Sequence, residues 1–191
     1  MKPAHDGKEN RITGGIKKNL MQSVMNHALE KLLSAYGQYY NVERDRPAPP
    51  FTAEAVFHSH EEQYFLIRAA RIAEADSHEY VFFALENVLT PERLQILDAA
   101  AWETGLARVN PHADHRNTDI TLIILAERIP PETQKQIRRR RHYKSYAFRL
   151  RGWSQYSLFA VEVPTGGCFW NREGQRLKKV IQGNISGDFR V

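Results

Sequence analysis

Two uninterrupted apolar runs, "YVFFAL" at residues 80–85 and "ITLIILA" at 120–126, constrain the fold most strongly. Both are the length of a strand and apolar on both faces, which is typical of strands buried within a sheet. Between them, "TPER" predicts a helix that starts with Thr90 as N-cap and Pro91 as first helical residue and ends near Ala107. A buried strand, a helix and another buried strand predict a parallel pair joined by a right-handed crossover.

The hydrophobic period changes several times around this unit. An amphipathic pattern over residues 16–36 predicts a helix that stops at Gly37, and "NVERDRPAPP" follows as a linker. Strands are predicted at residues 51–58, 63–74 and 79–86, forming a meander whose third strand is central, although the end of 63–74 also fits a helix. A short helix from Pro131 and antiparallel strands at 143–151, 155–163 and 168–171 come next. Residues 171–181 fit either a helix or a turn and strand.

These elements predict one α+β or α/β domain over residues 14–181, built on a mixed sheet with C-terminal antiparallel strands and a possible closing helix. The polar segment 1–13 is expected to be disordered, and 182–191 to be a loosely ordered tail. A chain of 191 residues suits one such domain. The core order αβββαβ resembles that of the restriction-endonuclease-like fold, an analogy that licenses no function by itself.

Composition excludes several classes of protein. The single cysteine, Cys168, excludes an internal disulfide and a thiolate metal cage, and its position in a strand predicts a packed thiol rather than a nucleophile. This cysteine usage favours the reducing cytoplasm. No apolar run approaches the roughly 18 residues that cross a bilayer, and residues 1–15 carry no hydrophobic segment of the signal-peptide kind, so we expect no membrane partner.

The positive charge is concentrated in one place, which we call the basic segment, residues 138–151. The chain has 27 basic and 22 acidic residues; removing the seven basic residues of this segment, which has no acidic one, leaves 20 against 22. Such a segment predicts a partner of negative charge: a phosphate-bearing ligand, a nucleic acid or an acidic protein. The candidate anion-binding residues are Arg138, Arg139, Arg140, Arg141, Lys144, Arg149 and Arg151.

The alternation within the segment separates rings from arginines. In a strand from residue 143, Lys144, Tyr146, Phe148 and Leu150 share one face and Ser145, Ala147, Arg149 and Arg151 the other. This pattern predicts that the aromatic rings are in the core and the arginines on a polar face. It therefore argues against a base-stacking platform, which needs exposed rings beside the cations.

A divalent-metal hydrolase of the nuclease kind is the alternative. Carboxylates of the meander (Glu54, Glu74, Asp76, Glu79 and Glu86) are candidate ligands for a hard cation, although no lysine lies between Lys31 and Lys135 to serve as the catalytic one. In the loop "PHADHRNTD", His112, Asp114 and His115 are candidate metal ligands, with His58 and His60 as possible additions. The other interpretation is a polar loop in which one histidine caps a carbonyl.

No phosphate-loop, dinucleotide or nucleophile-elbow motif is present, so no cofactor and no catalytic residue are identified. The run "YFLIRAARIAEADSHEYVFF" with "PHADH", "RGW" and "NREG" resembles a group of bacterial stand-alone single-domain proteins of unassigned function, over roughly residues 20–181. The resemblance implies one compact domain and no particular activity. We expect a binding or interaction module rather than an enzyme; a structural homo-oligomer with Trp153 and Trp170 as interface anchors is the third hypothesis.

Overall fold

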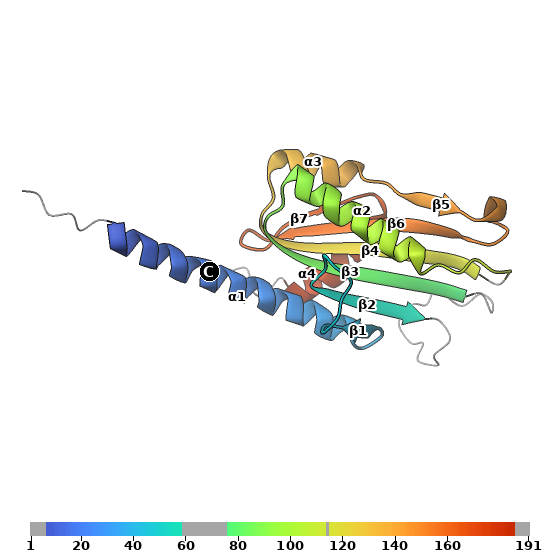
Figure 1. The fold of residues 1–191 in the computed structure, drawn as a ribbon, viewed down its shortest axis with the longest axis horizontal. Coiled ribbons are helices and arrows are strands. Elements are labelled where there is room, and N and C mark those ends of the chain that lie inside the picture. Colours follow the sequence, from blue (N-terminus) through green and yellow to red (C-terminus); the bar gives the residue numbers. More distant parts are fainter. Residues whose placement is uncertain (1–6, 59–75, 114, 186–191) are drawn as a thin grey trace, which may run out of the picture.

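The structure is a computed structural model that describes residues 7–58, 76–113 and 115–185, with side chains in these ranges except at 7–18, 58 and 76. Within these ranges the strands form one mixed sheet in the order β1-β2-β3-β4-β6-β5, with β7 also beside β6 (Figure 1). The strands are β1 (Asn41–Glu43), β2 (Ala53–His58), β3 (Asp76–Val88), β4 (His115–Arg128), β5 (Tyr143–Ser145), β6 (Trp153–Glu162) and β7 (Gly167–Trp170). The α-helices are α1 (Gly7–Tyr36), α2 (Pro91–Ala107), α3 (Pro131–Arg139) and α4 (Lys178–Ile185).

The two apolar runs are the central strands, as predicted. β3 and β4 are parallel, with Phe82 opposite Leu122, and β4 and β6 are parallel, with Leu122 opposite Leu158. All three side chains are fully buried. β2 pairs antiparallel with β3, so β3 is an interior strand as expected. The strand predicted at 63–74 lies outside the described residues.

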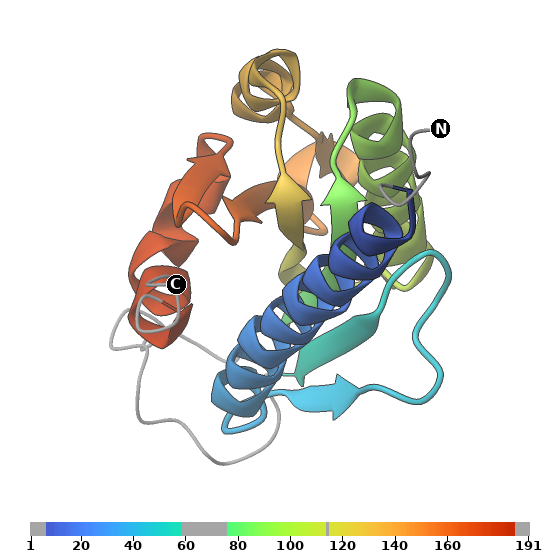
Figure 2. The same ribbon diagram turned by 90° about the vertical axis from the view of Figure 1, so that its left-hand side faces the viewer.

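Helices cover both faces of the sheet (Figure 1, Figure 2). Leu32 of α1 and Ile181 of α4 pack with Phe83 and other odd-numbered residues of the central strands. Leu94 of α2 and Ile137 of α3 pack with the even-numbered residues. Because successive strand residues point to opposite faces, each central strand contributes to two hydrophobic cores. The mixed α+β class is therefore confirmed.

The ends of the predicted elements agree in part. α1 ends at Tyr36, directly before Gly37, and α2 ends at Ala107 after the Thr90 N-cap, as predicted. The "NVERDRPAPP" segment is not only a linker, because its first residues form β1. A 3₁₀ helix, η2 (Glu173–Leu177), leads into α4, so the helical form of 171–181 is the observed one.

The described backbone is helical in part of each terminal segment, while the disorder of 1–13 and the loose order of 182–191 stay predictions. α1 is helical from Gly7, within the segment 1–13 for which composition predicts disorder, and α4 extends to Ile185, within 182–191. Residues 1–6 and 186–191 lie outside the described ranges. The described order α1, β1, β2, β3, α2, β4 is αβββαβ, and its resemblance to the restriction-endonuclease-like fold stays a prediction.

The strand predicted at 143–151 is wrong beyond Ser145. β5 has three residues and is followed by a single 3₁₀ turn, η1 (Ala147–Arg149). The φ angles of Ala147, Phe148 and Arg149 are 46°, 52° and 73°, in the left-handed region that an extended strand does not visit. The chain therefore turns back at once into β6, and residues 143–155 form a short antiparallel hairpin.

Candidate anion-binding surface

The cations of the basic segment come from three consecutive pieces of backbone. Arg138 and Arg139 end α3, Arg140 and Arg141 follow it, and the remaining three lie in the hairpin. Six are exposed (Arg138, Arg139, Arg141, Lys144, Arg149 and Arg151) and Arg140 is half-buried. The macrodipole favours cations at the end of α3, which explains part of the run.

Most of this charge has no acidic partner among the described residues. Arg140 lies 3.5 Å from the buried carboxylate of Asp98, which also accepts a hydrogen bond from Nε2 of His142 at 2.8 Å. The six exposed cations of the segment form no ion pair with any carboxylate that the structure describes. Their charge is therefore not neutralised by the described part of the chain.

The hairpin places aromatic rings beside these cations, contrary to the sequence prediction. The guanidinium carbon of Arg149 lies 5.8 Å from the ring centroid of Tyr143 and 5.6 Å from that of Trp153. Nε of Arg149 donates to the Tyr143 hydroxyl at 2.9 Å. Phe148 is 98% exposed, Leu150 81% and Tyr143 52%. The sequence pattern predicts buried rings only if the strand alternation continues through residue 150, and the left-handed turn at 147–149 ends that alternation.

His115 fixes the backbone of the hairpin through a hydrogen bond to the carbonyl of Arg151. Its Nδ1 lies 2.8 Å from the carbonyl oxygen of Arg151, and its Nε2 lies 3.0 Å from the Thr118 hydroxyl. Nδ1 must donate to a carbonyl, so in the neutral imidazole Nε2 accepts from Thr118. Gly152 has a φ of 77°, and a Cβ there would lie 2.4 Å from the carbonyl oxygen of Arg116. Both the positive φ and the close approach to the backbone of β4 therefore require glycine at position 152.

The histidine loop acts as a structural clamp at His115. Both ring nitrogens of His115 already have partners and the residue is buried, which agrees with the interpretation of a histidine that caps a carbonyl. The His112 ring centroid is 6.1 Å from that of His115, and Asp114 lies outside the described residues. In the described part of the chain, no three His, Cys, Asp or Glu side chains are grouped as a metal site would require.

The three meander carboxylates whose side chains the structure describes, Glu54, Glu79 and Glu86, each pair with a different arginine. Glu54 pairs with Arg108 at 2.6 Å, and Glu86 with Arg93 at 2.7 Å. Glu79 pairs with a third arginine, described below. Glu74 and the side chains of Asp76 and His58 lie outside what the structure describes, as does His60. The described members of this candidate set do not converge on one point.

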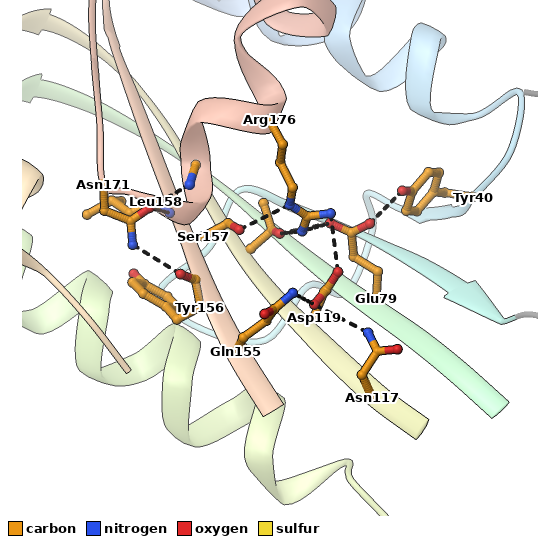
Figure 3. A network of polar contacts seen from close by, with 12 residues as sticks. Tyr40, Glu79, Asn117, Asp119, Gln155, Tyr156, Ser157, Leu158, Asn171 and Arg176 are labelled. Atoms are coloured by element: carbon orange, nitrogen blue, oxygen red, sulfur yellow. Dashed lines mark hydrogen bonds and ion pairs between the residues drawn. The ribbon is translucent and has the colours of Figure 1, made fainter. Parts of the chain in front are cut away.

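A polar network occupies the face of the sheet beneath η2 (Figure 3). Arg176 reaches from η2 to Glu79 on β3, at 3.0 Å, and to Asp119 on β4, at 3.2 Å. Tyr40, just after α1, donates to Glu79 at 2.7 Å, and Gln155 on β6 donates to Asp119 at 2.7 Å. One cation thus joins two carboxylates on neighbouring strands and fastens the C-terminal elements to the sheet.

Burial and charge shift the pKa values within this network. Burial raises the pKa of the Asp119 carboxyl, although the neighbouring Arg176 acts in the opposite direction. Burial lowers the pKa of Arg176, but Glu79 and Asp119 outweigh it and leave that pKa raised. Burial, and then the charge of Glu79, raise the pKa of the Tyr40 phenol. Around neutral pH the network therefore contains a permanent cation and a neutral phenol.

Asn171 closes a gap along the outer edge of β6 (Figure 3). On this side of β6, β5 pairs with residues 153–155 and β7 with 159–162, so residues 156–158 have a neighbouring strand only on the other side, where β4 lies. The Asn171 amide group donates to the carbonyl of Tyr156 at 3.0 Å, and its oxygen accepts from the Leu158 amide at 3.0 Å. It also accepts from the Gly174 amide and donates to the carbonyl of Arg140. The Asn171 side chain thus pairs with the backbone groups of Tyr156 and Leu158 that a neighbouring strand would otherwise bind.

A pocket with a volume of about 130 Å³ opens beside this gap. Arg141, His142 and Tyr143 line it from the basic segment, and Gln155 and Arg172 line it from the other side. His142 is fixed there, because its ring stacks on Trp102 at 5.2 Å while Asp98 holds its Nε2. The pocket is therefore continuous with the basic segment.

Several of these residues could not be found by pattern. Arg176, Asn171 and the pocket residue Arg172 are isolated polar residues in sequence, and Asp119 was visible only as part of the histidine loop "PHADHRNTD". "NREG" contains Asn171, Arg172 and Gly174, so the motif itself was visible without its role. Trp153 and Trp170, the proposed interface anchors, are half-buried; Trp170 stacks on Phe159 at 5.5 Å. The homo-oligomer hypothesis stays a prediction.

The fold and surface define a mixed α+β domain with a cationic, aromatic hairpin at one edge of its sheet. Residues 25–183 match the model of a family described as "Domain of unknown function (DUF8052)", and because most of the chain is covered, the protein belongs to that family. The sequence matches no curated protein and no solved structure. Across the described ranges, no helix combines the length and apolar character needed to cross a membrane.

Proposed function

We propose that this protein binds single-stranded nucleic acid through the basic segment and its hairpin. The observation that carries the proposal is the arrangement of Arg149 beside Tyr143 and Trp153, next to a Phe148 ring that is 98% exposed. Binding of an unpaired strand needs cations for the phosphates and open ring faces for the bases. The hairpin offers both within a few residues.

The combination of groups favours an unpaired strand over other anions. An acidic protein or a free phosphate would use the six exposed cations, but neither accounts for exposed rings at the hairpin tip. A duplex offers its phosphates but keeps its bases stacked, so Phe148 and Tyr143 would gain little from it. Bases of a single strand are free to stack on rings and on the guanidinium plane of arginine.

The backbone of the hairpin adds support. Three consecutive residues with left-handed φ, none of them glycine, carry a conformational cost, and such costs concentrate at functional sites. The result of that turn is to place the Phe148 side chain in solvent rather than in the core. The strained turn keeps an apolar ring exposed to solvent. A ligand that covers this ring on binding would explain why the protein maintains that conformation.

The test is fluorescence anisotropy with a labelled 12-nucleotide single strand and the matching duplex, at low salt, for the full chain and for Phe148→Ala. We expect the single strand to bind more tightly than the duplex, and Phe148→Ala to weaken single-strand binding by about 5- to 150-fold, the range for one base stacked on an aromatic side chain. The same variant should change duplex binding little. Equal affinity for both forms, with no effect of Phe148→Ala, would contradict the proposal and indicate general attraction of anions.

A further inference from the structure

The pocket at the open edge of β6 is too small for a whole nucleotide and large enough for one charged group. Its volume of about 130 Å³ compares with about 300 to 1,000 Å³ for pockets that enclose drug-sized ligands. It therefore suits a group of about the size of a phosphate. The groups that line it decide which kind.

Two arginines from different parts of the chain line this pocket. Arg141 comes from the basic segment and Arg172 from the turn after β7. The one carboxylate in the lining, Glu173, lies 3.8 Å from Nε of Arg172, with both side chains largely exposed. A long contact between exposed partners is weak, so Arg172 is available to a stronger anion. Guanidinium groups match phosphate oxygens two at a time.

We propose that this pocket binds the terminal phosphate of the nucleic-acid strand held by the hairpin. The inference rests on the proposed function and adds to it the recognition of a strand end. A terminal phosphate monoester carries more charge than the single charge of a phosphodiester and has only one substituent to accommodate. An internal phosphodiester carries a single charge and two chain substituents, so it gains less from the two arginines than a terminal monoester does.

Tyr143 connects the pocket to the hairpin surface. Its side chain lines the pocket and also contacts Arg149, which in turn covers Trp153. A phosphate held between Arg141 and Arg172 places the adjacent base at the Tyr143 ring. The following bases then lie toward the exposed guanidinium of Arg149 and the ring of Phe148, so one strand satisfies the pocket and the hairpin together.

The test compares three labelled single strands of one sequence: with a 5′-phosphate, with a 3′-phosphate and with neither. We expect one of the two phosphorylated ends, and not the other, to bind about tenfold more tightly than the unphosphorylated strand, the effect of one charge-assisted bidentate contact. Arg172→Ala should abolish this preference and leave the affinity for the unphosphorylated strand within about twofold. Arg172→Lys, which keeps the charge but loses the fork, should reduce the preference as well.

Arg138→Ala is the matched control, because it removes one exposed cation that does not line the pocket. It should weaken binding of all three strands equally and preserve the preference. Equal affinity for the three strands would overturn the inference while the proposed function stands. An equal gain from either end would do the same, since it would reflect added charge alone. Failure of all three strands to bind would instead contradict the proposed function, and with it the end recognition.

Discussion

The salt dependence of binding gives the sharpest test of how the basic segment works. For single strands, log K falls with log salt with a slope of about −0.7 for each phosphate that the protein neutralises. Six cations of the segment are exposed, so full use of them sets a slope of about −4. Between 50 and 200 mM salt this slope lowers the affinity by a factor of roughly 300.

Removing two of the six cations should change the slope by a known amount. Arg138→Ala with Arg139→Ala leaves four exposed cations, and we expect the slope to fall from about −4 to about −3. The assay is anisotropy with the labelled single strand at five salt concentrations. Arg44→Ala with Arg46→Ala is the control, because it removes two exposed arginines beside β1, at the opposite edge of the sheet from β5. Its slope should equal that of the unaltered protein.

Stacking and charge should separate in the same experiment. Phe148→Ala removes an uncharged ring, so it should lower the affinity at every salt concentration and leave the slope unchanged. A slope that is the same with and without Arg138 and Arg139 would refute the role of the segment. A control variant that loses as much slope as the Arg138 and Arg139 variant would show that only net charge matters.

Three further predictions concern the parts that support the surface. Asn171→Ala removes four hydrogen bonds and leaves buried backbone groups without partners. We expect the free energy of unfolding to fall by about 4 kcal/mol and Tm by about 10 °C. A loss of less than about 1 kcal/mol by calorimetry would contradict this. Arg176→Ala removes the cation that pairs with Glu79 and Asp119, so we expect the free energy of unfolding at pH 7 to fall by about 2 kcal/mol. This value is below that for a fully buried pair because the arginine is partly exposed. Burial already raises the pKa of Asp119, and loss of the guanidinium that opposes this raises it further in the folded variant. The folded variant therefore binds protons more readily as pH falls, and the stability loss should shrink toward pH 5; urea unfolding with an equal loss at both pH values would contradict the network. Gly152→Ala should lower the free energy of unfolding by about 2 kcal/mol or more and weaken binding of single-stranded nucleic acid, because the added Cβ would clash with the carbonyl oxygen of Arg116. An unchanged Tm and unchanged binding would show that the turn tolerates alanine.

The core of this fold was predictable because burial on both faces leaves a direct mark on the sequence. An apolar run of strand length, a capped helix and a second such run fix a parallel pair, and β3, α2 and β4 follow that prediction. The same logic failed at the hairpin. Lys144, Tyr146, Phe148 and Leu150 alternate as a strand with one buried face would, and the turn at 147–149 contains no glycine or proline to signal it.

The network and the pocket were not predictable for a different reason. Glu79, Asp119 and Arg176 are far apart in the chain and each is an ordinary polar residue of a strand or turn. Their relation depends on the alignment of β3 with β4, where Glu79 is opposite Asp119, and on the return of η2 across the sheet. Sequence spacing fixes which face of a strand a residue occupies, but not which distant side chain reaches it.

Three of the motifs that carry the family resemblance, "PHADH", "RGW" and "NREG", contribute residues that contact the backbone of the basic segment. His115, in "PHADH", donates a hydrogen bond to the carbonyl of Arg151 at one end of the segment. Asn171, in "NREG", donates one to the carbonyl of Arg140 near the other end. Gly152, in "RGW", allows the chain to pass within contact of the backbone beside His115. Polar side chains buried at these positions do little for a hydrophobic core, but they fix the backbone from which the exposed cations and rings project. That arrangement is expected where a surface must be presented in one conformation to a ligand, since a preformed site avoids the entropy of ordering it on binding.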